Sequence, residues 1–207
     1  MKRYIVIAFV TALSLGFGAT ALAQQGKTIM NINYSVNTPL GSFKSDVVSK
    51  TSLRGWNASI LYGLSNHFSL GVQAGFNDYS ETYARKVYDT KDGAISAVLS
   101  NSVQTIPIEI KAKYNFLPDA MVQPYIAAGT GGNIATFNQY LGEFSNSGKT
   151  KFSFAATPEA GITIPFGKSS ASGITVGANY NYMPFSYQGI KGLDNCGVFA
   201  GIKFPIR

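Results

Sequence analysis

The stretch Ile106–Phe116 reads IPIEIKAKYNF, and every second residue in it is apolar or aromatic. Strict alternation of this kind predicts a β-strand with two unlike faces. The second face carries Glu109, Lys111 and Lys113. A solvated surface would explain these charges, and so would the interior of a barrel whose outside contacts lipid. The rest of the sequence has to decide between the two interpretations.

The first residues predict a secretory signal peptide over residues 1–23. Lys2 and Arg3 precede a long apolar run, which ends in the small-residue cleavage site Ala21–Ala23. The alternative is an uncleaved membrane anchor, because the run is nearly long enough to span a bilayer. A cleaved signal peptide leaves residues 24–207 as one exported domain.

The composition favours strands and limits the possible functions. Charged residues make up only 13% of the chain, aromatic residues make up 13%, and there are 22 glycines. In a soluble domain, charged residues usually make up about a quarter of the chain. The lysines and arginines are scattered along an exported chain, which argues against a nucleic-acid partner. Cys196 is the only cysteine, so no intrachain disulfide is possible.

Alternation of apolar and polar residues recurs seven times clearly and an eighth time more loosely. The runs cover residues 30–36, 55–62, 68–77, 106–116, 123–137, 152–164, 174–182 and 197–206. Short turns join the second run to the third, the fourth to the fifth and the sixth to the seventh, whereas the other connections are mostly longer. This layout predicts an all-β fold, an eight-stranded antiparallel up-and-down transmembrane β-barrel, with both chain ends on the short-turn side.

Alternation alone does not say which face is inside, because a soluble lipocalin-type barrel alternates too. The interior of an eight-stranded barrel is only just wide enough to be filled by side chains. The apolar face is rich in Ile, Phe and Tyr and is too bulky for that space, whereas the other face is mostly Gly, Ser, Thr, Asn and Gln. We therefore expect the apolar face to contact lipid, with aromatic belts near both strand ends and closure between the first and eighth strands.

The chain resembles the small eight-stranded outer-membrane β-barrel family, the porin-family type represented by OmpX and the transmembrane domain of OmpA. The resemblance rests on the signal peptide, the strand VQTIPIEIKAKYNF, the segment QPYIAAGTGG and the terminal strand GVFAGIKFPIR. It implies residence in the cell outer membrane of a Gram-negative bacterium, contact with outer-membrane lipid and insertion by the barrel-assembly machinery. Family members commonly end in an aromatic residue, whereas here Phe204 is followed by Pro205, Ile206 and Arg207.

In such a barrel, the charged face of the opening stretch points into the lumen. Glu109, Lys111 and Lys113 share that face, and Glu159 and Lys203 have inward parity on the sixth and eighth strands. Charges in a low-dielectric interior need partners, and the resemblance implies a lumenal ion-pair network that plugs the barrel. We expect Glu109 to lie within salt-bridge reach of an inward lysine. A proton or ion pathway is the alternative.

Residues 78–102 form the longest expected loop, in which tyrosines are mixed with charged residues. This mixture suits contact with an extracellular protein partner. The candidate contact residues are Tyr79, Tyr83, Arg85, Lys86 and Tyr88. Later in the segment, Ile95, Val98 and Leu99 fit one side of a helical turn. The equally weighted alternative is that the two flanking strands extend above the membrane.

No pattern in the sequence predicts catalysis, a cofactor or a metal centre, so we do not expect an enzyme. His67 is the only histidine, and it lies in a short turn without an acidic neighbour, which favours a structural role over that of a catalytic base. Gly129–Gly132 has no following helix, so it suggests small residues beside bulky lumenal side chains rather than a nucleotide site. We assign no role to Cys196.

Three functional hypotheses follow. The first is an integral outer-membrane protein with a structural or surface-interaction role and a narrow, ion-pair-plugged lumen. The second is a channel or carrier for small or hydrophobic solutes, which would pass through the lumen or through a lateral gap at the weak run 123–137. The third, an outer-membrane barrel enzyme, is disfavoured because the site chemistry is missing.

Overall fold

The computed structural model describes residues 26–90, 93–141, 144–167, 170–186 and 192–206, and within 88–95 and 141–149 it describes the backbone alone. The predicted signal peptide lies outside these ranges. The barrel strands are β1 (Thr28–Pro39), β2 (Ser52–Gly63), β3 (Phe68–Thr82), β6 (Leu99–Asn115), β7 (Gln123–Leu141), β8 (Phe144–Pro165), β9 (Gly173–Asn181) and β10 (Asn195–Ile206). The other elements are α2 (Gly41–Asp46), β4 (Lys86–Thr90) and β5 (Gly93–Ala97).

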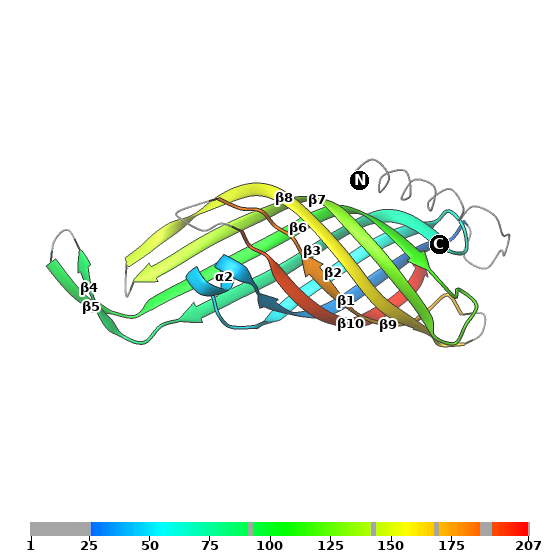
Figure 1. Ribbon diagram of the computed structural model, residues 1–207, viewed down its shortest axis with the longest axis horizontal. Coiled ribbons are helices and arrows are strands. Elements are labelled where there is room, and N and C mark those ends of the chain that lie inside the picture. The colour runs from blue at the N-terminus through cyan, green and yellow to red at the C-terminus, as the bar shows by residue number, and fades with distance from the viewer. Residues whose placement is uncertain (1–25, 91–92, 142–143, 168–169, 187–191, 207) are drawn as a thin grey trace, which may run out of the picture.

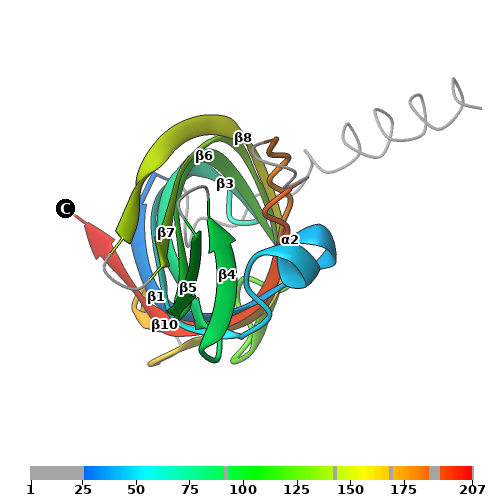
Figure 2. The same cartoon turned by 90° about the vertical axis from the view of Figure 1, so that its left-hand side faces the viewer.

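Eight strands close into a barrel in the order β1-β10-β9-β8-β7-β6-β3-β2, and every neighbouring pair is antiparallel. Closure is made by β1 and β10, which pair from Thr28 opposite Ile206 to Pro39 opposite Asn195. Figure 2 looks along the barrel and shows the strands forming a ring. The predicted fold class and the closure between the first and last strands are confirmed.

The outer face of the barrel is apolar and its interior is polar, the reverse of a soluble protein. On β6, the outward side chain of Ile110 is 61% exposed, whereas its inward neighbour Lys111 is 4% exposed. The same contrast runs along the other strands, whose large exposed side chains are mostly apolar and whose buried side chains are mostly Asn, Ser, Thr, Gln, Glu and Lys. This pattern confirms the expectation that the apolar face points outward.

Four adjacent strands, β3, β6, β7 and β8, continue well beyond the others at the long-loop end (Figure 1). The structure corrects the sequence interpretation here, because β7 and β8 extend beyond the predicted runs 123–137 and 152–164 and pair through most of the residues between them. Residues 78–102 form the upper parts of β3 and β6 together with the hairpin β4–β5, which lies at the far left of Figure 1. The expected helical turn is wrong, since Ile95 belongs to β5 and Leu99 begins β6.

The loop between β1 and β2 contains the short helix α2. Gly41 begins the helix with a φ of +54°, a left-handed conformation that glycine adopts without steric cost. The helix covers six residues and buries Phe43. No helix within the described ranges is long and apolar enough to cross a membrane.

Candidate functional site

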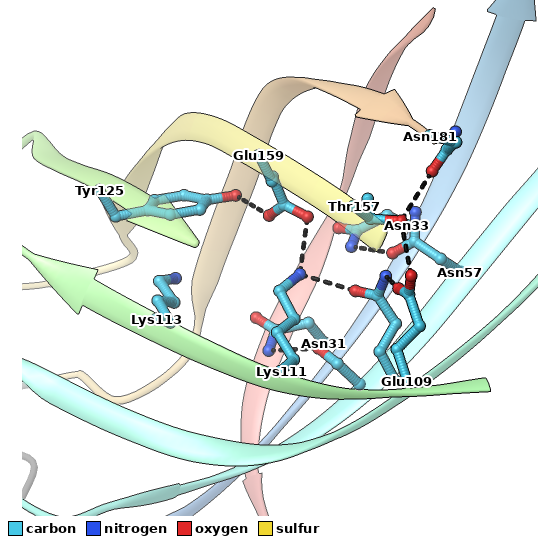
Figure 3. Close-up of polar contacts among 12 residues, drawn as sticks. Asn31, Asn33, Asn57, Glu109, Lys111, Lys113, Tyr125, Thr157, Glu159 and Asn181 are labelled. Atoms are coloured by element: carbon cyan, nitrogen blue, oxygen red, sulfur yellow. Dashed lines mark hydrogen bonds and ion pairs between the residues drawn. The ribbon is translucent and has the colours of Figure 1, made fainter. Parts of the chain in front are cut away.

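The middle of the lumen is filled by a charged layer, which we define as Gln73, Glu109, Lys111, Tyr125, Thr157 and Glu159. Its centre is an ion pair between β6 and β8, the two strands that flank β7, with Lys111 Nζ 2.7 Å from Glu159 Oε2 and each side chain 4% exposed. The same ammonium donates to Gln73 Oε1 at 2.7 Å, and the Tyr125 hydroxyl donates to Glu159 Oε1 at 2.8 Å. Figure 3 shows these contacts, with Lys111 on β6 and with Glu159 on β8. The pair is therefore desolvated and hydrogen-bonded at both ends.

The expected ion pair of Glu109 is wrong. Among the described residues, Lys111 pairs with Glu159, and Glu109 has no lysine within 4.0 Å. Its carboxylate instead accepts hydrogen bonds from Thr157 Oγ1 at 2.8 Å and from Gln73 Nε2 at 3.2 Å. Gln73 lies directly opposite Glu109 in the β3–β6 register. The glutamine amide therefore lies between the carboxylate and the lysine and joins them indirectly.

Small residues make room for this layer. A Cβ atom at Gly129 would lie 2.7 Å from Glu109 Oε2, and one at Gly161 would lie 2.9 Å from the Tyr125 ring. Both distances are shorter than a normal contact, so an added methyl group at either position would force the neighbouring large side chain to shift. Gly129 thus occupies the position suggested by the sequence, beside a bulky inward neighbour.

Two further lysines lie below the charged layer, toward the short-turn end. Lys113 Nζ lies 3.7 Å from the centre of the Tyr125 ring and 3.4 Å from Thr163 Oγ1. Lys203 Nζ donates to Gln123 Oε1 at 3.4 Å. All five charged residues predicted for the lumen therefore lie inside it, although only Lys111 and Glu159 form an ion pair with each other.

Two small cavities lie in the lumen. One cavity of about 10 Å³ lies below the charged layer and a second of about 10 Å³ lies above it. That volume is close to the minimum needed to hold one water molecule. The upper cavity is bordered by amides that include Asn57, Asn77 and Asn181. Each of these two cavities is therefore about large enough for one water molecule, and the charged layer separates them.

An apolar plug closes the long-loop end, and it was not predicted. The barrel wall and the two loops that border β1 and β10 both contribute to it. Its members are Phe43, Val47, Val48, Tyr79, Val103, Ala135, Ala155, Met183, Phe185 and Leu193. The rings of Phe43 and Tyr79 meet edge to face with their centres 4.9 Å apart. A hydrophobic core of the kind found in soluble proteins therefore lies above the polar lumen.

Hydrogen bonds fasten the first loop over this plug. The backbone N–H and the hydroxyl of Ser49 both donate to the Glu81 carboxylate. The Tyr83 hydroxyl and the Asn101 amide both donate to the carbonyl of Val47 at 3.1 Å. Burial alone would raise the pKa of the Glu81 carboxyl, but the bonds from Ser49 and nearby positive charge hold that pKa below its ordinary value. Glu81 is therefore charged at neutral pH.

The candidate surface-contact residues have different environments. Tyr79 is fully buried in the apolar plug, because β3 continues past the expected strand end and turns this side chain inward, so its assignment to the surface is wrong. Tyr83 is half-buried, and its hydroxyl binds the first loop. Arg85 and Lys86 are exposed. The side chain of Tyr88 lies outside the described residues.

His67 lies in the turn between β2 and β3. One ring nitrogen, Nδ1, is 2.8 Å from the carbonyl oxygen of Asn115, and the ring stacks on Tyr114 with centres 5.7 Å apart. These contacts fit a structural role in the turn. Within the described part of the chain, no three His, Cys, Asp or Glu side chains gather as metal ligands.

The fold is similar to those of solved outer-membrane proteins. Neisserial surface protein A (NspA) superposes with a TM-score of 0.57 at 15% identity, covering 86% of this chain and 97% of that one. OprG from Pseudomonas aeruginosa superposes with a TM-score of 0.51 at 11% identity, covering 91% and 100%. No curated protein matches the sequence. A family model described as the outer membrane protein beta-barrel domain matches residues 9–204, so the chain belongs to that family.

Proposed function

We propose that this outer-membrane barrel is a non-conducting protein whose role is structural or depends on contacts at the cell surface. The observation that carries the proposal is the presence of two seals at different heights in the lumen. The charged layer fills the middle of the barrel, and the apolar plug fills its long-loop end. A solute would have to disrupt both in order to pass.

The two seals resist solutes for different reasons. An ion or a polar solute at the charged layer would have to displace a buried salt bridge whose partners are also held by Gln73 and Tyr125. At the apolar plug it would also lose its hydration. A hydrophobic solute would tolerate the plug but would meet the charged layer below. The two layers in series therefore exclude both classes of solute.

A lateral exit at the weak run 123–137 has no support. In β7, the pairing with β6 runs from Tyr125 to Leu141. The pairing with β8 begins at Gln123 and shows one shift in register, between Phe137 and Gln139. The glycines and alanines of β7 reduce its side-chain bulk but do not interrupt its backbone pairing with β6 and β8.

Planar-bilayer recording tests the seals. The wild-type protein is expected to give no stable conductance, and neither is a variant in which residues 41–48 are replaced by two glycines, nor a Lys111→Ala/Glu159→Ala variant. The variant that combines both changes is expected to conduct, because only it opens both seals. An Arg54→Ala/Asp78→Ala variant is the matched control, since it removes an ion pair outside the lumen. Stable conductance by the wild-type protein would contradict the proposal.

A surface role requires the long-loop end to face outward from the cell. The sheet of β3, β6, β7 and β8 and the hairpin β4–β5 stand at this end, and Lys86 is exposed there. After Cys196→Ser removes the native thiol, Lys86→Cys should react with a membrane-impermeant maleimide on intact cells. Asp119→Cys, in the short turn between β6 and β7, should react only after the outer membrane is opened. The reverse labelling pattern would refute the orientation.

A further inference from the structure

Two buried lysines border one small cavity at the short-turn end of the lumen. We name it the lysine cavity, and it is lined by Ile29, Asn31, Leu61, Ser69, Lys113, Asn115 and Lys203. Lys113 is 7% exposed and Lys203 is 4% exposed. Ile29 and Ser69 are each the second residue of their strand, which places the cavity next to the turns. It is therefore a separate site from the charged layer and the apolar plug.

Neither lysine has a carboxylate partner. Among the described residues, no acidic side chain lies within 4.0 Å of either ammonium, and each makes one long hydrogen bond of 3.4 Å, to Thr163 or to Gln123. An ammonium group has three donors. Apart from the contact of the Lys113 ammonium with the Tyr125 ring, most of the donor capacity of these two groups is therefore not used by the described residues.

The nearby carboxylates are already occupied. In Glu159, Oε1 accepts from Tyr125 and Oε2 accepts from Lys111. The oxygens of Glu109, in the same charged layer, accept from Thr157 and Gln73. Among the described residues, three lysines, counting Lys111, and two glutamates are buried at and below the charged layer, which leaves an excess positive charge beside the lysine cavity.

We propose that the lysine cavity binds one small inorganic anion of halide type, with chloride as the natural ligand. Two buried like charges that share a cavity repel each other, and an anion between them relieves that repulsion and accepts their unused hydrogen bonds. The hydroxyl of Ser69, on the cavity wall, is a further donor. The cavity volume of about 10 Å³ is close to that needed for one water molecule, which favours a single monatomic ion over larger anions such as phosphate or sulfate.

The cavity's position indicates how the ion enters. Its lining comes from the turn-proximal residues of β1, β2, β3, β6 and β10. The apolar plug lies at the opposite end of the barrel, so an anion reaching the cavity from the short-turn side need not pass it. The site is thus expected to exchange with the compartment on that side while the lumen stays closed.

The test compares anions at equal ionic strength. The protein in uncharged detergent micelles is unfolded with urea in sodium chloride and in sodium gluconate, whose anion is too large for the cavity. In chloride, the equilibrium constant for unfolding should fall tenfold for each tenfold rise in concentration above the dissociation constant. In gluconate it should change only slightly. Equal midpoints in the two salts at every concentration would overturn the proposal.

Variants assign the effect to the lysines. Lys113→Met and Lys203→Met should each abolish the difference between chloride and gluconate. Lys27→Met is the matched control, because Lys27 is an exposed lysine at the same end of the barrel, and this variant should keep the difference. Loss of the chloride effect in Lys27→Met as well would show a nonspecific salt effect and refute the site.

Bromide provides a direct measurement on the wild-type protein, which does not depend on the variants folding. Crystals soaked in sodium bromide should show an anomalous peak between the ammonium groups of Lys113 and Lys203. A soak of Lys113→Met crystals should lose it. A cavity that holds only a water molecule, with no anomalous signal, would overturn the assignment.

Discussion

Removal of the buried Lys111 ammonium should lower the free energy of unfolding far more than removal of one member of an exposed ion pair. In the Lys111→Met variant, the Glu159 carboxylate loses a donor at 2.7 Å and keeps only the Tyr125 hydroxyl. The carboxylate is then left buried without an ion-pair partner. Loss of one member of a buried ion pair costs about 3–5 kcal/mol.

The matched control is the Arg54–Asp78 pair on the outer surface. Its nitrogen–oxygen distance is 3.3 Å, and the Arg54 side chain is 72% exposed. Solvent screens such pairs, so Arg54→Gln should cost less than about 1 kcal/mol. The comparison separates the effect of burial from that of losing a positive charge.

Urea titration in micelles measures both variants. Trp56 is the only tryptophan and faces outward, so its fluorescence reports transfer from the apolar environment to water. Glu159→Gln should restore part of the stability of Lys111→Met, because the double variant no longer buries the Glu159 carboxylate without its lysine, with a coupling of about 0.5–3 kcal/mol. A loss below about 1 kcal/mol in Lys111→Met would refute the view that this ion pair braces the lumen.

Three other changes test separate parts of the structure. Gly129→Ala should cost about 1–3 kcal/mol in the same titration, because the new methyl group would displace the Glu109 carboxylate, and an unchanged midpoint would contradict the close approach. Ile110→Lys should cost about 2–4 kcal/mol if this outward residue lies near the bilayer midplane, and a neutral result in lipid would argue against a lipid-facing surface. The pKa of Glu81 is lowered in the folded protein. The hydrogen bonds from Ser49 to the Glu81 carboxylate should therefore be fully formed above the ordinary carboxyl pKa and should be lost as the pH falls through the lowered pKa. Faster hydrogen exchange at the Ser49 amide under acidic conditions, beyond the intrinsic pH effect and absent in Glu81→Gln, is the expected observation.

Within the bilayer region, the architecture follows from a simple period. Successive strand residues face opposite sides, so the inward position of Glu109 predicts that of Lys111 and Lys113. The choice of ion-pair partner does not follow. Lys111 on β6 meets Glu159 on β8, past the intervening strand β7, and that contact depends on the stagger and tilt of the closed barrel. Sequence parity thus places the charges but does not pair them.

The apolar plug was missed because the polarity rule changes at the top of the barrel. Alternation in β3 continues past Asn77, but Tyr79 is an apolar residue facing inward, whereas Asp78 and Ser80 face outward. Once the wall rises above lipid, the ordinary preference of soluble proteins returns, with apolar groups inside. A reversal of polarity along one uninterrupted alternation is therefore the sequence signal that would have located the plug.

The position of the plug has a consequence for assembly. Its loop residues come from the segments that follow β1 and precede β10, the two strands whose pairing closes the barrel. A backbone bond from Leu40 N–H to the Asp194 carbonyl, 2.9 Å long, continues that pairing into the loops. The two segments meet only after the chain ends have joined. We therefore expect the plug to stabilise the closed barrel, because separating β1 from β10 would first expose the hydrophobic core of the plug to water.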